Sequence, residues 1–181
     1  MMPIRTFRCA ALVATMLGIS PAALRAADST LVLTSPAFAS GTAIPAQYSC
    51  KGGDESPALI WSGSRADVRS FALIVEDPDA PSSTFIHWVI FNLPGGATGI
   101  PAGVPATPSL PDGSTQGTNS FGSIGYRGPC PPPGQPHHYH FILFALDSTL
   151  GANSEADAGT VRSAMSGHVN ASTELVGTFS R

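Results

Sequence analysis

The sequence predicts a mainly β protein in a single domain. Apolar stretches rich in β-branched and aromatic residues recur along the chain, and such stretches are typical of strands. Segments rich in Gly, Pro and Ser separate them and predict turns or loops, and the clearest helical pattern lies near the C-terminus. The predicted strands are Leu31–Leu33, Leu59–Trp61, Ser70–Glu76, Phe85–Leu93 and Tyr139–Leu146.

Residues 1–26 are predicted to be a secretory signal peptide rather than part of the fold. Arg5 and Arg8 precede an apolar run at Cys9–Ile19, and small residues follow near Ala26, which is the usual order in a signal peptide. The run is too short for a membrane span, which needs about 20 residues. We therefore expect cleavage after Ala26, with the alanines three residues earlier and one residue later as alternatives. The expected product is a single domain at 27–181 with periplasmic or secreted localisation and no integral membrane association.

The expected mature chain is acidic. The whole sequence has nine Lys and Arg residues and twelve Asp and Glu residues. Three of the basic residues and none of the acidic ones lie in the signal peptide, so the mature formal charge is six minus twelve, or −6. An acidic chain is a poor partner for nucleic acid or an anionic membrane. We therefore expect no nucleic-acid partner, and we expect any small anion to be held by local geometry.

Two cysteines remain once Cys9 has left with the signal peptide. In an oxidising compartment Cys50 and Cys130 are expected to form a disulfide. Two buried thiols are the alternative, because the sequence does not say whether the two Cα atoms lie within bonding range.

Two further segments lack a clear strand pattern. Residues 94–136 are rich in Pro and Gly, so we expect a long ordered loop, and loops of that length in a compact domain are usually functional or disordered. Ala156–His168 carries apolar residues at spacings of three and four and predicts a helix, with Gly159 and Thr160 as its N-cap. The next segment, Ala171–Val176, is compatible with either a helix or a strand.

Histidines are concentrated in two of the predicted strands. In Phe85–Leu93, the alternation of side chains places His87 on one face. Val89 and Phe91 are expected on the same face, and Trp88 on the opposite one. A histidine in so apolar a strand needs a partner, which is either a backbone carbonyl in the core or a group in a binding site.

The second histidine segment divides its polar residues between two faces. His137 and Tyr139 share one face, and His138 and His140 share the other, so the four side chains cannot all serve one site. An H-x-H pair can ligate zinc or copper. A third ligand is not evident in the sequence, so we predict neither a metal nor another cofactor.

Asp77 and Asp79 lie in the sequence Asp77-Pro-Asp-Ala-Pro81, in which the prolines stiffen the backbone. Either the carboxylates cap a local turn, or the stiff loop aims one of them into a site. A carboxylate beside a histidine fixes its tautomer and favours the imidazolium. On the second interpretation, Asp77 is expected to orient His87.

Several motifs, taken in order, resemble one protein family. They are Tyr48-Ser-Cys-Lys-Gly-Gly-Asp-Glu-Ser-Pro-Ala-Leu-Ile-Trp61, Asp77-Pro-Asp-Ala-Pro81, His87-Trp88, Gly128-Pro-Cys-Pro-Pro132 and Pro136-His-His-Tyr-His-Phe141. This combination resembles the phosphatidylethanolamine-binding proteins, and in particular their bacterial Raf-kinase-inhibitor-like branch. The resemblance covers nearly the whole mature chain.

The resemblance implies a β-sandwich-like fold with a large central sheet, a smaller sheet and peripheral C-terminal helices. It also implies a small pocket for phosphate-like anions, including phospholipid head groups, and a cis peptide before Pro81. It assigns His137 rather than His138 to the pocket. The implied ligand-binding residues are Asp77, Asp79, His87, Gly128, Cys130, Pro132, His137 and Tyr139.

Four residues depart from the usual pattern of the family: Arg127, Pro133, His138 and His140. Relatives often carry arginine and an apolar residue at the last two positions. Arg127 replaces a small residue, and it is expected either to clamp an anion or to pair with an acid on the surface, the role we favour. Pro133 stands where many relatives have lysine, which removes a positive charge near the mouth of the pocket.

The leading functional hypothesis is a secreted, non-enzymatic protein that binds a small anion, either phosphate or a phosphorylated head group, with an unidentified protein as a further partner. The sequence has no Gly-x-Ser-x-Gly elbow, metalloprotease motif or phosphate loop, so we expect no catalytic residue. One alternative is a weak hydrolase that uses Asp77 and His87 as an acid–base pair, and another is an inhibitor of a protease or kinase.

In the binding hypothesis His87 and His137 lie on neighbouring strands and Tyr139 donates its hydroxyl. Anion binding then strengthens as the pH falls from about 8 to 6.

Overall fold

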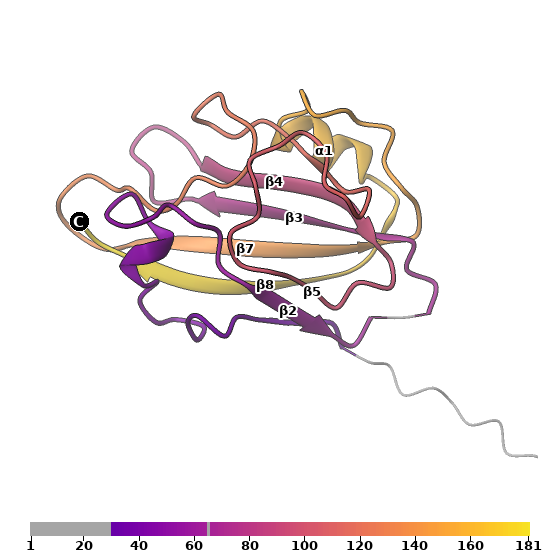
Figure 1. The fold of residues 1–181 in the computed structure, drawn as a ribbon, viewed down its shortest axis with the longest axis horizontal. Coiled ribbons are helices and arrows are strands. Elements are labelled where there is room, and N and C mark those ends of the chain that lie inside the picture. Colours follow the sequence, from indigo (N-terminus) through magenta and orange to yellow (C-terminus); the bar gives the residue numbers. More distant parts are fainter. Residues whose placement is uncertain (1–29, 65) are drawn as a thin grey trace, which may run out of the picture.

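The structure, a computed structural model, describes residues 30–64 and 66–181 (Figure 1), so the predicted signal peptide lies outside the described residues. The strands form two antiparallel sheets, which confirms the mainly β fold class. The small sheet has the order β1-β2-β5 and consists of β1 (Val32–Thr34), β2 (Leu59–Ser62) and β5 (Gly99–Ile100). The large sheet has the order β6-β4-β3-β7-β8 and consists of β6 (Thr115–Gln116), β4 (Phe85–Pro94), β3 (Ser70–Asp77), β7 (His137–Leu146) and β8 (Val169–Phe179). The described helices are the 3₁₀ turn η1 (Ala46–Tyr48) and the helix α1 (Ala158–Ala164).

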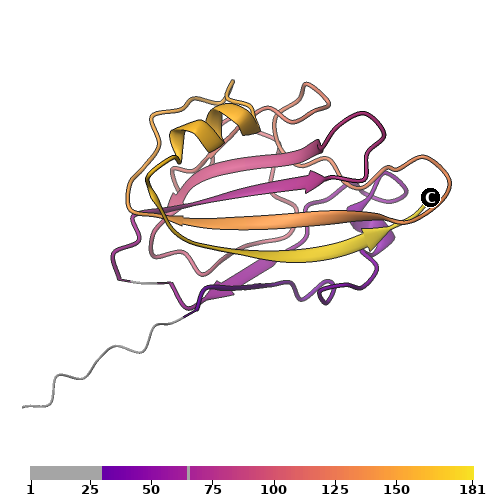
Figure 2. The ribbon, with the colours of Figure 1, turned by 180° about the vertical axis from the view of Figure 1, so that it is seen from behind.

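The large sheet is covered on both faces. One face packs against the small sheet in a core that includes Trp61, Phe71 and Trp88. The other face packs beneath α1 in a second cluster that includes Ile74 and Val161. Figures 1 and 2 show α1 and the small sheet on opposite sides of the large sheet. Successive residues of β3 therefore enter alternate clusters, which explains why a central strand of this sheet is apolar on both sides.

The C-terminal helix is shorter than predicted and begins differently. Asp157 is its N-cap, and the Asp157 carboxylate accepts a hydrogen bond from the Thr160 N–H at 2.7 Å. The prediction of Gly159 and Thr160 as the N-cap was wrong, because the acceptor that the first turn needs comes from the preceding carboxylate. The segment compatible with either helix or strand belongs to β8, which pairs with β7 along its length. Within the described residues, α1 is therefore the one C-terminal α-helix.

β4 carries an irregularity at His87. Val75 of β3 pairs with Trp88, and the next residue, Glu76, pairs with Ile86. His87 is therefore an extra residue in β4 with no counterpart in β3. A bulge of this kind breaks the two-residue period of a strand.

The bulge changes the face on which His87 lies. Trp88 belongs to the core beneath the small sheet, and His87 contacts Tyr139 of the same core. Val89 and Phe91 lie in the cluster beneath α1. The predicted alternation was therefore wrong, because His87 and Trp88 face the same side.

The loop between β4 and β7 is ordered, contains the short strands β5 and β6, and is joined to the N-terminal third of the chain. A disulfide links Cys50 to Cys130, with 2.10 Å between the sulfur atoms and 5.5 Å between the Cα atoms, which confirms the predicted bridge. The Tyr126 hydroxyl donates to the Tyr48 carbonyl at 2.7 Å. The turn after η1 is thus anchored to the loop that precedes β7.

The peptide bond before Pro81 differs from the expected geometry. Peptide bonds of the described residues are trans, so the cis peptide expected before Pro81 was wrong. No helix in residues 30–64 and 66–181 has the length and apolar character that a membrane crossing requires.

Candidate functional site

A cavity of about 180 Å³ opens at one end of the large sheet. The antiparallel strand order brings the end of β3 and the first residues of β4 and β7 to this end. Asp77, His87 and His137 meet there although they are far apart in the sequence. The lining residues are Asp77, Ala80, Pro81, Phe85, His87, Phe121, Cys130, Pro131, Pro132, His137 and Tyr139.

Two of the eight predicted ligand residues do not line this cavity. Gly128 lies behind its wall, where the Gly128 N–H donates to Asp54 Oδ1 at 2.6 Å. A Cβ at this position would collide with the Tyr48 carbonyl oxygen, so glycine permits a close approach of two backbone segments. Asp79 accepts hydrogen bonds from His138 instead. The six predicted residues that line the cavity are Asp77, His87, Cys130, Pro132, His137 and Tyr139.

The partner of the Asp77 carboxylate is His137. Asp77 Oδ2 lies 2.7 Å from His137 Nδ1, and both side chains are largely buried. The expectation that Asp77 orients His87 was therefore wrong. β3 lies between β4 and β7, so both histidines are on strands next to that of Asp77. His87 Nδ1 is held by the Arg127 carbonyl instead, which leaves His137 as the partner of the carboxylate. The expectation that His87 and His137 lie on neighbouring strands was also wrong, because β3 separates β4 from β7.

His87 is oriented by a backbone carbonyl. Its Nδ1 lies 2.6 Å from the Arg127 carbonyl oxygen. A carbonyl oxygen can only accept, so Nδ1 carries the proton and the neutral ring has its lone pair on Nε2. Burial lowers the pKa of His87, and the bond to Arg127 and the charge of Asp77 oppose that shift.

Tyr139 supplies a buried hydroxyl at the cavity wall. The residue is 1% exposed, and its hydroxyl makes no hydrogen bond to the residues that the structure describes. Burial, then the negative charge of Asp77 and an interaction of the hydroxyl with that carboxylate, raise the pKa of Tyr139, so the hydroxyl keeps its proton at neutral pH. The Asp77 carboxylate is therefore near the hydroxyl, although not within hydrogen-bond distance. Buried polar groups normally have a partner. The Tyr139 hydroxyl can therefore donate to a group that enters the cavity.

The sequence interpretation missed most of the apolar wall. The exposed ring of Phe121 packs edge-on against Phe85 and His87, with 4.8 Å and 5.6 Å between ring centroids. Phe121 lies in the long loop, where no periodic pattern singles out one residue. Proximity to the stiff Asp-Pro-Asp loop could have indicated two of the others. Besides the predicted ligand residues, the cavity is lined by Ala80, Pro81, Phe85, Phe121 and Pro131, of which only Pro131 lies within residues 128–132, the segment that was expected to form its floor.

Comparison with known proteins agrees with the motifs. The sequence model of the phosphatidylethanolamine-binding protein family matches residues 34–180. The chain belongs to the phosphatidylethanolamine-binding protein family.

Relatives from distant organisms are similar over most of this family member. A UPF0098 protein of Methanothermobacter thermautotrophicus is 47% identical over 149 residues, which cover 82% of this chain and 98% of that protein. A Mycobacterium tuberculosis protein named as a lipoprotein, LppC, is 40% identical over 82% of this chain and 72% of its own length. The crystal structure of E. coli YbcL, described as a member of the mammalian PEBP family, has a TM-score of 0.78 and 33% identity, and the match covers 83% of this chain and 98% of that chain.

In this phosphatidylethanolamine-binding protein family member, Arg127 takes the surface role that the sequence favoured. The Arg127 Nε lies 3.0 Å from Asp54 Oδ2, and the side chain is 52% exposed. The guanidinium also lies 5.4 Å from the centre of the Phe121 ring, a cation–π contact. Arg127 is therefore held beside the cavity wall rather than within it.

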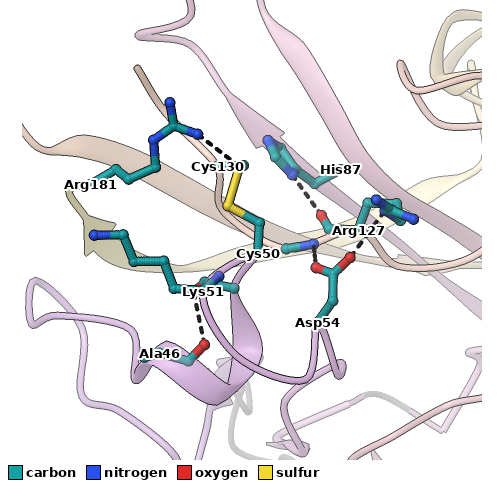
Figure 3. Close-up of a disulfide and its surroundings, with 10 residues drawn as sticks. Ala46, Cys50, Lys51, Asp54, His87, Arg127, Cys130 and Arg181 are labelled. Atoms are coloured by element: carbon teal, nitrogen blue, oxygen red, sulfur yellow. Dashed lines mark hydrogen bonds and ion pairs between the residues drawn. A yellow bond between two sulfur atoms is a disulfide. The ribbon is translucent and has the colours of Figure 1, made fainter. Parts of the chain in front are cut away.

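The disulfide end of the cavity of this family member carries positive charge. Cys130 lines the cavity, and Arg181 Nη1 lies 3.7 Å from the Cys130 sulfur. Figure 3 shows Lys51 and Arg181 beside the disulfide. These two cations flank the disulfide, whereas Pro133 is not among the residues that line the cavity.

His138 and His140 point away from the cavity, and each has its own carboxylate. His138 Nδ1 lies 2.7 Å from Asp79 Oδ2, and His140 Nδ1 lies 3.0 Å from Glu174 Oε2. The hydrogen bond from His138 is the main cause that lowers the pKa of Asp79. Among the described residues, no group of three or more His, Cys, Asp or Glu side chains is arranged to hold a metal ion.

Proposed function

We propose that this protein is an exported, non-enzymatic binding protein that takes a small phosphate-like anion into the cavity at the end of the large sheet. The observation that carries the proposal is the Tyr139 hydroxyl, a buried donor at the cavity wall that has no hydrogen-bond partner among the described residues. An oxygen of the anion accepts from this hydroxyl. His87 and His137 each use Nδ1 within the protein, so Nε2 is the nitrogen that meets the anion.

The size of the cavity and the cations beside its disulfide wall favour a small anion. Its volume of about 180 Å³ is below the roughly 300–1,000 Å³ of pockets that enclose drug-sized ligands. A phosphate fits within it, and the remainder of a phosphorylated head group stays outside. Lys51 and Arg181 lie beside the disulfide wall, and local positive charge concentrates anions even on a protein that is acidic as a whole.

We further propose that the mature protein is a single domain at 27–181 that is periplasmic or secreted. The family match over residues 34–180 supports one domain, and the relative named as a lipoprotein supports export. The disulfide also favours an oxidising compartment. N-terminal sequencing of the protein isolated from its host tests this proposal, and a mature chain that still begins with Met1 would contradict it.

Calorimetric titration with inorganic phosphate and with phosphoethanolamine tests the binding proposal. Tyr139→Phe keeps the buried ring and removes only the hydroxyl, so we expect binding to weaken about tenfold or more. His138→Ala is the matched control, because this exposed side chain points away from the cavity, and we expect it to bind like the wild type. If Tyr139→Phe binds both ligands as tightly as the wild type, the hydroxyl does not hold the anion and the proposal fails.

Weak hydrolysis is a second candidate function, because the geometry offers a different acid–base pair from the predicted one. Asp77 and His137 lie 2.7 Å apart, and a carboxylate that orients an imidazole is a common arrangement of a general base. Turnover of p-nitrophenyl phosphate or p-nitrophenyl acetate that is lost in His137→Ala would favour a hydrolase. No turnover by a wild-type protein that binds phosphate would favour the binding protein. A protein partner, and with it inhibition of a protease or kinase, stays a prediction.

A further inference from the structure

Asp54 holds the peptide group on which the orientation of His87 depends. Asp54 Oδ1 accepts from the Gly128 N–H at 2.6 Å. The carbonyl of the same peptide group, that of Arg127, accepts from His87 Nδ1 at 2.6 Å. A continuous hydrogen-bond chain thus runs from the Asp54 carboxylate through one peptide group to the imidazole ring (Figure 3). Hydrogen bonds arranged in this way polarise and strengthen one another.

The position of Asp54 is itself tightly specified. Its backbone has φ of 56°, in the left-handed region that Asp and Asn tolerate better than most residues. Its second oxygen, Oδ2, pairs with Arg127 Nε at 3.0 Å. The Arg127 N–H donates in turn to the His87 carbonyl at 3.0 Å. The carboxylate and both peptide groups of Arg127 therefore fix the cavity wall next to His87.

The hydrogen-bond chain determines what His87 offers to a ligand. With the proton fixed on Nδ1, the neutral ring presents Nε2 as an acceptor. The charged and titratable groups that face the ring are Asp77 from β3, His137 and Tyr139 from β7, and Asp54 and Arg127 from the two loops. Burial outweighs the nearby carboxylates and lowers the pKa of His87, so the ring stays neutral to a lower pH than an ordinary histidine does.

We propose that Asp54 is a positioning residue that sets the ligand specificity of the cavity. It fixes the Arg127–Gly128 peptide so that His87 offers Nε2 as an acceptor. The cavity consequently prefers phosphate groups that carry a proton over phosphodiesters, which carry none. This inference rests on the proposed function and names the ligand class of the same site. The P–OH group donates to His87 Nε2, while another phosphate oxygen accepts from the Tyr139 hydroxyl. No bond is made or broken.

The first experiment compares two probes with the same charge at acidic pH. Methyl phosphate, a monoester, and dimethyl phosphate, a diester, are titrated into the wild-type protein at pH 5.5 and 7.5. We expect the monoester to bind at least about tenfold more tightly than the diester at pH 5.5, because the diester leaves Nε2 without a donor. Equal affinity for the two probes in the wild type would overturn the proposed preference.

The second experiment tests the role of Asp54 through the ring itself. The ¹⁵N chemical shifts of histidine-labelled protein report which ring nitrogen carries the proton. In the wild type we expect His87 to be the Nδ1–H tautomer at pH 7.5. In Asp54→Ala we expect a mixture of tautomers and a monoester preference reduced to within about threefold, since the charge-assisted bond to the Gly128 N–H is lost. An unchanged tautomer in Asp54→Ala would overturn the positioning role.

Three variants separate positioning from a general loss of structure. Asp54→Asn fits the same backbone and keeps an acceptor for the Gly128 N–H, so it should retain the Nδ1–H tautomer and restore most of the preference. Arg127→Gln removes the ion pair but keeps the peptide carbonyl, so it should also retain the tautomer. Asp112→Ala removes a carboxylate that caps a turn at Ser114, away from the cavity, and should change neither readout. Loss of the tautomer in Arg127→Gln as well would assign the positioning to the ion pair and contradict the hydrogen-bond chain.

Failure of the proposed function can be recognised separately. If the wild type binds neither phosphate probe, anion binding fails as a function, whereas the NMR comparison of the wild type with Asp54→Ala still decides whether Asp54 fixes the tautomer of His87. If the wild type binds both probes and the Asp54 variants do not alter the preference, anion binding stands and the positioning role fails.

Discussion

Two histidine–aspartate pairs lie next to one another where β7 begins, and they differ chiefly in burial. In both His137–Asp77 and His138–Asp79, Nδ1 and Oδ2 are 2.7 Å apart. The side chains of the first pair are 12% and 4% exposed, and those of the second are 54% and 42% exposed. Alternation along β7 turns the first pair toward the cavity and the second away from it. The two pairs therefore have the same contact distance, but only the buried pair faces the cavity, and burial is what distinguishes them.

The physical basis of the difference is solvation. Water screens an exposed ion pair, which typically contributes about 0–1 kcal/mol to stability. Removing one partner from a buried pair leaves the other without compensation in a medium that solvates it poorly, which commonly costs about 3–5 kcal/mol. Four sets of substitutions test the contrast between groups at the buried cavity and groups at the surface. They are described from the largest expected effect to the smallest.

The wall of the cavity, unlike the exposed His138–Asp79 pair, is also held by a covalent cross-link. The Cys50–Cys130 disulfide closes a loop with a sequence separation of 80 residues, and chain-entropy arguments give roughly 3–5 kcal/mol for such a cross-link. We expect the double variant Cys50→Ser/Cys130→Ser to lose about this much free energy of unfolding in urea. The reduced wild-type protein is the control for the substitutions themselves. A loss below about 1 kcal/mol would mean that the non-covalent contacts of the loop suffice.

Asp77→Asn should have the next largest effect. It leaves the buried His137 ring without its carboxylate, so we expect the free energy of unfolding to fall by about 2–4 kcal/mol at pH 7. Urea denaturation followed by circular dichroism measures the loss. The matched variant is Asp79→Asn at the exposed pair, and equal losses in the two variants would show that burial does not distinguish them.

Burial of His87 predicts a pH dependence of stability. Because the pKa of His87 is lowered in the folded protein, the unfolded chain takes up the proton first, and stability falls as the pH drops below about 6.5. We expect His87→Gln to show a smaller loss of stability between pH 7.5 and 5.5 than the wild type. Any gain in anion binding from protonation of His87 also moves to lower pH than the range of 8 to 6 expected from the sequence.

The control for that prediction is the exposed His168, which pairs with Asp147 at the surface. His168→Gln should retain the wild-type dependence of stability on pH. If His87→Gln instead shows the wild-type dependence over the same range, burial of His87 is not its cause.

The smallest effect is expected at the exposed pair. The hydrogen bond from His138 lowers the pKa of Asp79, so its contribution is present above the unfolded pKa of about 3.9 and is lost as the pH falls through the folded value. Because both side chains are largely exposed, we expect Asp79→Asn to cost less than about 1 kcal/mol at pH 7. The difference from the wild type should shrink further at pH 3. A difference that grows on acidification would contradict this assignment.

The sequence predicted the strands well because their signals are local. Apolar runs of the right length identified β3, β4 and most of β7, whereas β8 was left open between helix and strand, and the motifs identified six of the lining residues. The face of His87 could not be predicted, because a bulge follows from pairing with β3 rather than from the sequence of β4 alone. The partner of Asp77 could not be predicted either, because His87 is held by the carbonyl of Arg127, a residue 40 positions away in the sequence. Phe121 was missed because an exposed aromatic residue in a loop resembles any other loop residue.

The disulfide has a mechanical consequence as well. Strands β2 to β6 lie between Cys50 and Cys130, whereas β1, β7 and β8 lie outside the closed loop. A pulling force applied at the two termini passes through the disulfide from one cysteine to the other. The bond therefore shields the strands between the two cysteines from the load. The sequence separation of 80 residues corresponds to roughly 280 Å of extended chain, a length that stays hidden in a stretching experiment until the bond is reduced. Under tension, β7 and β8 can therefore be stripped from the large sheet, while β3, at its centre, bears load through its contacts with segments outside the closed loop, chiefly its hydrogen bonds to β7.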